Sequence, residues 1–239
     1  MQVSDFRDKN KGEITFLLGS GPSLHDVNID IIKNYLCIAV NSSIDKYSDC
    51  DFFISDDSDI KSWNYYDVIK KSPCVKFFYE KKFKNIVSDW KNIILYDHKS
   101  WYSPENNSYY LDGLRLTKDE PIIGARISMG SALHIAYILG CNPIVLIGND
   151  ARVVDGKRYY WQFPGEKKQY RIKGRKFTRQ TQQIGFDEKA YRKYWESFAE
   201  VNKDIIGKEI NIIDASNSSL DCFPKMTIEE VLEKENKNE

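Results

Sequence analysis

A series of short, uninterrupted apolar runs constrains the fold of this chain more than any other feature. The runs occupy residues 14–18, 36–40, 51–54, 75–79, 92–96, 143–148 and 210–214. Continuous rather than alternating apolar residues are typical of strands covered on both faces, as in a parallel sheet. Segments of helical length lie between several of the runs, at 24–34, 58–70, 128–139 and 187–204. This alternation predicts an α/β fold with a doubly wound, mostly parallel sheet.

The length of the chain and its long connections suggest how this sheet is elaborated. A chain of 239 residues suits one large α/β domain, so we expect residues 1–239 to form a single folding unit. Two segments, 97–125 and 149–182, are longer than ordinary connections in such a fold. The second is rich in basic and aromatic residues, and between residues 157 and 179 its only acid is Glu166.

We expect residues 149–182, called the lid segment below, to close over an anionic ligand. Arg158, Arg171 and Arg175 would supply the positive charge. The same mixture of basic and aromatic residues also suits a nucleic-acid strand, whose backbone and bases it would contact. A solvated surface is the simpler interpretation for most of the individual lysines.

Overall charge and cysteine content exclude few functions. Lys plus Arg and Asp plus Glu number 35 each, so net charge selects for neither nucleic acid nor membrane. The charged N-terminus lacks the apolar stretch of a signal peptide, and no apolar run reaches membrane-spanning length, so we expect a cytoplasmic protein without a membrane span. The five cysteines show no C-x-x-C spacing, which indicates neither a disulfide framework nor a zinc site.

The first apolar run ends in a glycine turn made of Gly19, Ser20, Gly21, Pro22 and Ser23. Such a turn presents backbone N–H groups at the carboxyl edge of a sheet, and the dipole of a following helix favours phosphate there. The turn lacks the third glycine of G-x-G-x-x-G and the Gly-Lys-Ser/Thr of a P-loop. The turn is therefore either a phosphate cradle or a tight strand-to-helix corner, and by itself it favours neither.

Polar residues follow the next strands at the same predicted edge. Asn41 follows the second run, where its amide would reach a ribose or a base, or would simply cap a turn. Asp56, Asp57 and Asp59 follow the third run. Clustered carboxylates hold Mg²⁺ or act as a general base. We assign such a role to Asp56 and interpret Asp57 and Asp59 as capping or solvated residues.

The stretch from 124 to 150 combines a helix with a strand end. Ser128 and Gly130 are small residues at the start of the predicted helix, which allows a ligand to approach closely. Asn149 and Asp150 follow the next buried run, where a carboxylate would meet a sugar hydroxyl or orient a catalytic group. His134, alone on the helix, is interpreted as a packing residue.

The order of "GSGPSL", "VNSS" and "ISMGSALHIAYILGCNPIVLIGND", followed by a loop with tyrosines, resembles the bacterial sialyltransferases of the Campylobacter type. It also resembles the wider superfamily that contains the motility-associated glycosyltransferases and the archaeal hydroxymethylpterin pyrophosphokinases. The resemblance covers residues 13–160 and weakens beyond them. It implies a single Rossmann-like domain that binds a CMP-activated sugar without an obligatory metal.

The resemblance also implies roles for individual residues. Ser20, Gly21, Asn41 and Ser128 would contact the nucleotide or the donor sugar, and we extend this donor-binding set to their neighbours Gly19, Pro22, Ser23, Gly130 and Asn149. Tyr159 or Tyr160 would donate a hydrogen bond to the departing phosphate. The sialyltransferases carry a histidine base in the following loop, which this chain lacks. Asp56 or Asp150 would then remove the acceptor proton.

The sequence thus predicts a glycosyltransferase that uses a nucleotide-sugar donor and an acceptor glycan, protein or DNA. One alternative is a pyrophosphokinase that uses ATP and Mg²⁺, to which the acidic strand end is loosely similar. Another is a DNA-modifying glycosyltransferase or a non-catalytic module that binds nucleotides or nucleic acid.

Overall fold

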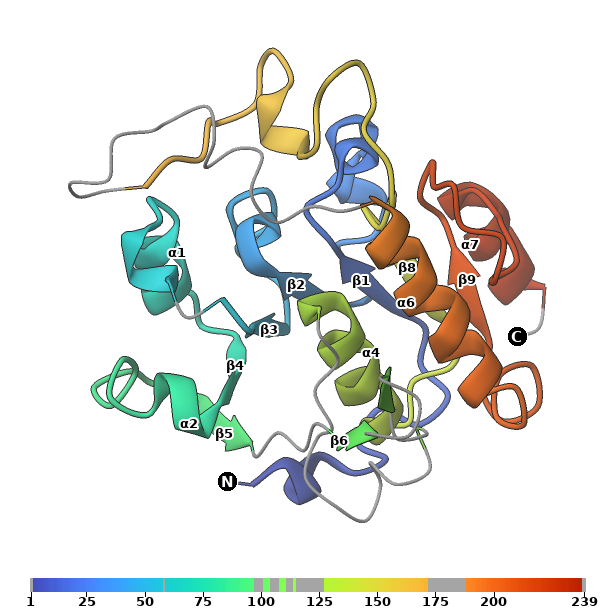
Figure 1. The fold of residues 1–239 in the computed structure, drawn as a ribbon, viewed down its shortest axis with the longest axis horizontal. Helices are drawn as coiled ribbons and strands as arrows, with labels where there is room; N and C mark the ends of the chain where they lie inside the picture. Colours follow the sequence, from blue (N-terminus) through green and yellow to red (C-terminus); the bar gives the residue numbers. More distant parts are fainter. Residues whose placement is uncertain are drawn as a thin grey trace.

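The computed structural model describes residues 2–57, 59–96, 101–103, 108–110, 114, 127–171 and 188–237. Its main feature is a seven-stranded sheet in which all neighbouring strands are parallel (Figure 1). The strands are β1 (Thr15–Leu18), β2 (Leu36–Val40), β3 (Phe52–Ser55), β4 (Val75–Tyr79), β5 (Ile93–Tyr96), β8 (Ile144–Ile147) and β9 (Ile212–Asp214). Each lies in one of the apolar runs, so the predicted α/β fold with a Rossmann-like parallel sheet is confirmed.

The strand order is β5-β4-β3-β2-β1-β8-β9. From β1 the chain builds the sheet outward to β5, then returns to the other side of β1 to add β8 and β9. The direction of winding therefore reverses between β1 and β8. In open α/β sheets, ligands bind beside the carboxyl ends of the strands at this reversal.

The helices are of two kinds. The α-helices of the main body are α1 (Tyr66–Lys71), α2 (Glu80–Phe83), α4 (Ser128–Ile138), α6 (Glu188–Val201) and α7 (Ile228–Asn236). The 3-10 helices are η1 (Val3–Phe6), η2 (Pro22–Asp26), η3 (Ile29–Ile31), η4 (Asn41–Asp45), η5 (Ile60–Ser62) and η6 (Tyr160–Gln162). Helices α4 and α6 agree with the predicted segments 128–139 and 187–204.

Two other helix predictions need correction. Segment 24–34 contains η2 and η3 rather than one α-helix, because Val27 is extended and the Asn28 side chain accepts a hydrogen bond from the Asp30 N–H at 3.1 Å. An Asn side chain that bonds to the backbone in this way competes with helix continuation. Segment 58–70 is divided into η5 and α1 by Trp63, which is extended and bridges to Arg171.

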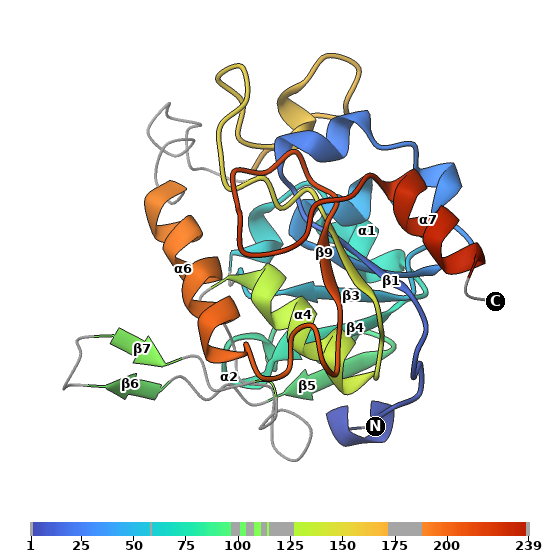
Figure 2. The same cartoon turned by 90° about the vertical axis from the view of Figure 1, so that its right-hand side faces the viewer.

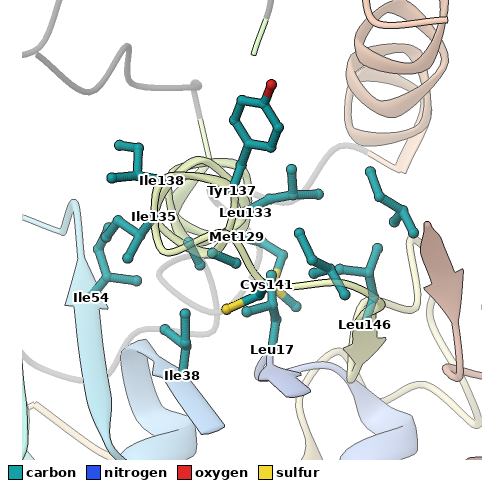
Figure 3. Packing of buried hydrophobic residues seen from close by; sticks show 14 of the residues in the cluster. Leu17, Ile38, Ile54, Met129, Leu133, Ile135, Tyr137, Ile138, Cys141 and Leu146 are labelled. Atoms are coloured by element: carbon teal, nitrogen blue, oxygen red, sulfur yellow. The ribbon is translucent and has the colours of Figure 1, made fainter. Parts of the chain in front are cut away.

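Two hydrophobic layers cover the sheet. On one face, α4 packs against the strand residues Leu17, Ile38 and Ile54 (Figure 3). Helix α6 adds Trp195 and Phe198 to the same cluster (Figure 2). Every residue of α4 from Met129 to Ile138 is buried, as expected for a helix that is apolar on all sides. The other face, with Phe16 and Leu18, is covered by the 3-10 helices η2 to η6, by α1, α2 and α7, and by part of the lid segment.

A small antiparallel pair, β6 (Trp101–Ser103) and β7 (Ser108–Tyr110), lies apart from the main sheet (Figure 2). Within the described residues, no helix has the length and apolar character needed to cross a membrane. Helix α7, in the charged C-terminal segment, begins with a capping box in which Thr227 and Glu230 bond reciprocally to each other's backbone.

Candidate functional site

A pocket of about 340 Å³ opens at the carboxyl edge of the sheet, where β1, β2, β3 and β8 end. Its walls bring together most of the residues that the sequence singled out: Gly19, Ser20, Gly21, Pro22, Asn41, Asp56, Ser128, Asp150, Arg158 and Tyr159. The remaining candidates Ser23, Gly130, Asn149, Tyr160 and Arg171 are not among the lining residues. Arg175 lies outside the described residues. The pocket thus occupies the position at which this class of sheet binds ligands.

Backbone amides of the glycine turn are hydrogen-bonded to the end of strand β8 and the residues after it. The N–H groups of Gly19 and Gly21 donate to the carbonyl oxygens of Ile147 at 2.7 Å and Gly148 at 2.8 Å. The N–H of Ser23 donates to the Asp150 carboxylate. The prediction that the turn offers free backbone amides to a phosphate is therefore wrong at these three positions. The helix after the turn is a five-residue 3-10 helix rather than the expected α-helix, so few peptide dipoles are aligned behind the turn.

The glycines of the turn are required because two strand ends approach closely. A Cβ atom added at Gly19 would lie 2.4 Å from the Gly148 carbonyl oxygen. At Gly21 it would lie 2.2 Å from Oδ2 of Asp150 and 2.6 Å from the same carbonyl oxygen. Gly148 has a φ of +66°, which only glycine adopts at no steric cost. The glycines thus form a tight corner that is also one wall of the pocket.

Asp150 is a buried carboxylate on the β8 side of the pocket, 2% exposed. Its oxygens accept hydrogen bonds from the Ser23 N–H at 3.1 and 3.2 Å and from the Ser23 hydroxyl at 3.0 Å. Burial, and to a lesser extent the charge of Asp214, raises the pKa of Asp150 to about 6, although the Ser23 hydrogen bonds and Arg152 lower it. A carboxyl group with this pKa suits proton transfer near neutral pH.

The carboxylates at the end of β3 are held by protein donors. Asp56 accepts from the Tyr96 hydroxyl at 2.5 Å and from the Ser131 hydroxyl at 2.8 Å. Asp57 accepts from the Asp59 N–H and the Trp63 indole, both at 2.9 Å. Among the described residues, no group of three or more His, Cys, Asp or Glu side chains is arranged to hold a metal. These donors do not fit a preformed Mg²⁺ site.

Asn41 and the serines of the pocket link the strand ends to one another. Asn41 has a φ of +55°, and its Oδ1 accepts from the Ser55 hydroxyl at 2.7 Å. The Ser20 hydroxyl donates to the Val40 carbonyl at 3.2 Å. The Ser128 hydroxyl accepts from the Asp56 N–H at 3.1 Å. These bonds join β1, β2, β3 and α4 into one rigid edge.

The two candidate tyrosines of the lid segment have different environments. The Tyr160 hydroxyl donates to the Ser42 carbonyl at 2.8 Å, and its N–H donates to the Ser20 carbonyl at 3.1 Å. Tyr160 therefore anchors the lid segment to the glycine turn. Tyr159 lines the pocket and stacks on Trp161 with ring centroids 5.2 Å apart. Burial raises the pKa of the Tyr159 phenol, so this phenol stays protonated at neutral pH.

The basic residues of the lid segment are divided between the pocket and the body of the protein. Arg171 donates to Asp59 at 3.1 Å and lies over the Trp63 ring, so it binds the protein rather than the pocket. Glu166, the only acid between residues 157 and 179, accepts from Lys46 at 2.5 Å and contacts His25 at 2.9 Å. Of the two proposed arginines that the structure describes, Arg158 lines the pocket and Arg171 does not.

Two polar lining residues, Arg152 and Tyr191, were not found from the sequence. Arg152 follows Asp150 by two positions, in the part of the lid segment before the basic run. Tyr191 comes from α6, and its hydroxyl donates to Oδ1 of Asn149 at 2.7 Å. No local pattern marks Tyr191, because its place beside the pocket depends on how α6 packs on the sheet. Because Arg152 is only two positions from the candidate Asp150, the sequence could have indicated that Arg152 lies at the site.

The fold and the site together define a doubly wound α/β protein with a polar pocket at the point where the direction of winding reverses, between β1 and β8. The fold is similar to that of the MAf glycosyltransferase from Magnetospirillum magneticum AMB-1, with a TM-score of 0.54 and 10% sequence identity. The likeness covers 95% of this chain but only 37% of that protein. No family model matches the sequence, and no curated protein matches it. At this identity the likeness is one of fold alone.

Proposed function

We propose that this protein is a glycosyltransferase that uses a nucleotide-activated, CMP-sugar-like donor. The observation that supports the proposal most is the composition of the pocket at the carboxyl edge of the sheet, where the direction of winding reverses. It combines a carboxylate of raised pKa, Asp150, with a neutral phenol, Tyr159, and with arginine side chains. The fold likeness to a glycosyltransferase supports the same class of reaction.

In the proposed reaction, Asp150 is the general base. Its carboxylate accepts the proton of the acceptor hydroxyl, whose oxygen forms a bond to the anomeric carbon of the sugar. The bond between that carbon and the donor phosphate breaks, and its electron pair leaves with the nucleotide. Tyr159 donates a hydrogen bond to the departing phosphate, and Arg158 adds positive charge where negative charge develops.

Asp150 is a better candidate for the base than Asp56, although both line the pocket. The pKa of Asp150 is raised to about 6, so the group is largely ionised at neutral pH and still basic enough to hold a proton. Asp56 accepts a bond from a protein hydroxyl on each of its oxygens. Its local role is to join α4, β3 and β5.

A ligand screen followed by a hydrolysis assay tests the proposal. Melting temperature is measured with CMP, CDP, UDP, GDP and ATP, each with Mg²⁺ and with chelator, because a ligand that binds only the folded state raises it. We expect stabilisation by CMP in chelator, and slow hydrolysis of a CMP-sugar without acceptor. No binding or turnover of any nucleotide sugar in a broad panel would refute the proposal. Stabilisation by ATP only with Mg²⁺ would indicate a pyrophosphokinase instead.

A further inference from the structure

The pocket has two arginine side chains in its wall, Arg152 and Arg158. Positive charge in a partly enclosed pocket attracts anions more strongly than the same charge in open solvent. The protein as a whole is neutral, with 35 basic and 35 acidic residues. Attraction for an anionic ligand must therefore come from local groups such as these two.

Arg152 differs from the acidic groups around it in its hydrogen bonding. Its Nε is buried and has no hydrogen-bond partner within the described part of the chain. The carboxylates of Asp56, Asp57 and Asp150, by contrast, each accept bonds from protein donors. Buried donors are rarely left unbonded in native proteins, and such a group calls for a specific explanation. Because Arg152 also lines the pocket, an anion bound there would lie beside this guanidinium.

The glycine turn is poorly suited to bind the anion. The N–H groups of Gly19, Gly21 and Ser23 are bonded within the protein, and Pro22 has none. These three amides are therefore not available to a phosphate in the pocket, and its binding depends more on side chains. A guanidinium is well suited to the task, because its planar fork of donors matches two phosphate oxygens at once.

The backbone between Asp150 and Arg152 is held in an unusual conformation. Ala151 has a φ of +54° and is 2% exposed. A left-handed conformation is uncommon for alanine, and such residues cluster at functional sites. With Ala151 in this conformation, Asp150, Ala151 and Arg152 all line the same pocket. The proposed base Asp150 and the Arg152 guanidinium thus share one wall of the pocket.

We propose that Arg152 binds the phosphate of the nucleotide, with Arg158 completing an anion subsite on the β8 side of the pocket. This inference rests on the proposed function and specifies how that site recognises its donor. The ligand class is a nucleotide bearing at least one phosphate, recognised without a metal ion. The nucleoside part lies outside this subsite, so its binding does not depend on Arg152.

Binding measurements on paired ligands test this assignment. Titration calorimetry in chelator, at fixed ionic strength, compares CMP, UMP, GMP and AMP with their nucleosides and with inorganic pyrophosphate. Arg152→Gln is expected to weaken binding of the best nucleotide by about tenfold or more, without weakening its nucleoside. Arg152→Lys should retain part of the affinity, because it keeps the charge but not the fork.

The matched control is Arg192→Gln, the same change at an exposed α6 arginine that donates to Ser219 at 3.1 Å and does not line the pocket. This variant should bind the nucleotide like the wild type. Circular dichroism and melting temperature without ligand establish that each variant is folded. An Arg152→Gln variant that fails to fold is replaced by Arg152→Lys, whose unchanged nucleotide affinity would then count against the assignment.

Three results overturn the inference: equal nucleotide affinity in wild type and Arg152→Gln, equal losses for nucleotide and nucleoside, or no binding of any phosphate ligand by the wild type. Failure of this inference can be distinguished from failure of the proposed function. If Arg152 binds the nucleotide but no nucleotide sugar reacts, the anion subsite stands and the glycosyltransferase assignment fails. If nucleotide sugars react equally well in wild type and Arg152→Gln, the assignment stands and the subsite fails.

Discussion

Replacing Asp150 with asparagine should change how the stability of the protein depends on pH. The pKa of Asp150 is raised from 3.8 to about 6, with burial as the largest cause. Since one pKa unit corresponds to 1.36 kcal/mol, the buried carboxylate costs the folded state roughly 3 kcal/mol at neutral pH. At 2% exposure, solvent screening reduces this cost little. Asparagine keeps a similar shape and an acceptor oxygen for Ser23 but carries no charge.

The sign of the effect follows from where the proton is bound. Between pH 3.8 and about 6, the folded state holds a proton on Asp150 that the unfolded chain has released. The contribution of this group to the free energy of unfolding therefore falls as pH rises through that window and is constant above it. Relative to the wild type, Asp150→Asn should gain roughly 3 kcal/mol of stability between pH 4 and pH 7.

Urea denaturation of both proteins between pH 4 and pH 7.5, in buffers without phosphate, measures this difference. The difference between the two free energies cancels most contributions from other carboxylates. A companion variant, Ser23→Ala, removes a hydroxyl that lowers the pKa of Asp150, so its pH window should extend upward. A stability difference between wild type and Asp150→Asn that stays constant from pH 4 to pH 7.5 would refute the reasoning.

Four further substitutions test other parts of the structure. Gly21→Ala should lower the free energy of unfolding by about 1–3 kcal/mol or more, because the added methyl would lie 2.6 Å from a backbone carbonyl oxygen of the β8 turn; wild-type stability in urea would contradict this packing. Tyr159→Phe should slow CMP-sugar hydrolysis by about 10- to 100-fold. Tyr160→Phe should lower the melting temperature and leave the hydrolysis rate within a few-fold of wild type. Equal hydrolysis rates for the two variants would exclude Tyr159 from the mechanism. Glu166→Gln removes the carboxylate that accepts from Lys46 at 2.5 Å. It should lower the free energy of unfolding by about 1–3 kcal/mol and speed proteolysis within residues 151–171. Unchanged cleavage would show that this ion pair does not hold the segment in place.

The strands could be predicted from sequence because burial on both faces leaves a local trace. Each strand of a two-sided sheet consists of consecutive apolar residues, and Phe16, Leu17 and Leu18 face alternate layers in this way. The helices were predicted less evenly. Helix α4 is long and apolar, but segment 24–34 breaks at Asn28, because a single side-chain bond to the backbone outweighed the helical length of the segment.

The edge of the sheet at which the candidate residues meet was also predictable. Parallel strands place their carboxyl ends together, so Asn41, Asp56 and Asp150, each following a strand, were expected at one edge, and all three line the pocket. The particular partners of these groups were not predictable. Ser23 and Asp150 are 127 positions apart along the chain, and their hydrogen bond depends on β1 and β8 being neighbours.

By itself, therefore, the sequence determined the α/β class, the parallel strands and the edge that carries the polar residues, since these depend on local composition and strand direction. Only the tertiary structure decided which groups remain available for a ligand. The amides of Gly19, Gly21 and Ser23 are bonded to the end of β8 and the residues after it, and Arg171 is paired with Asp59. Among the residues that the structure describes, the buried Nε of Arg152 has no hydrogen-bond partner. The availability of a donor or acceptor depends on all its neighbours in space, and most of these come from distant parts of the chain.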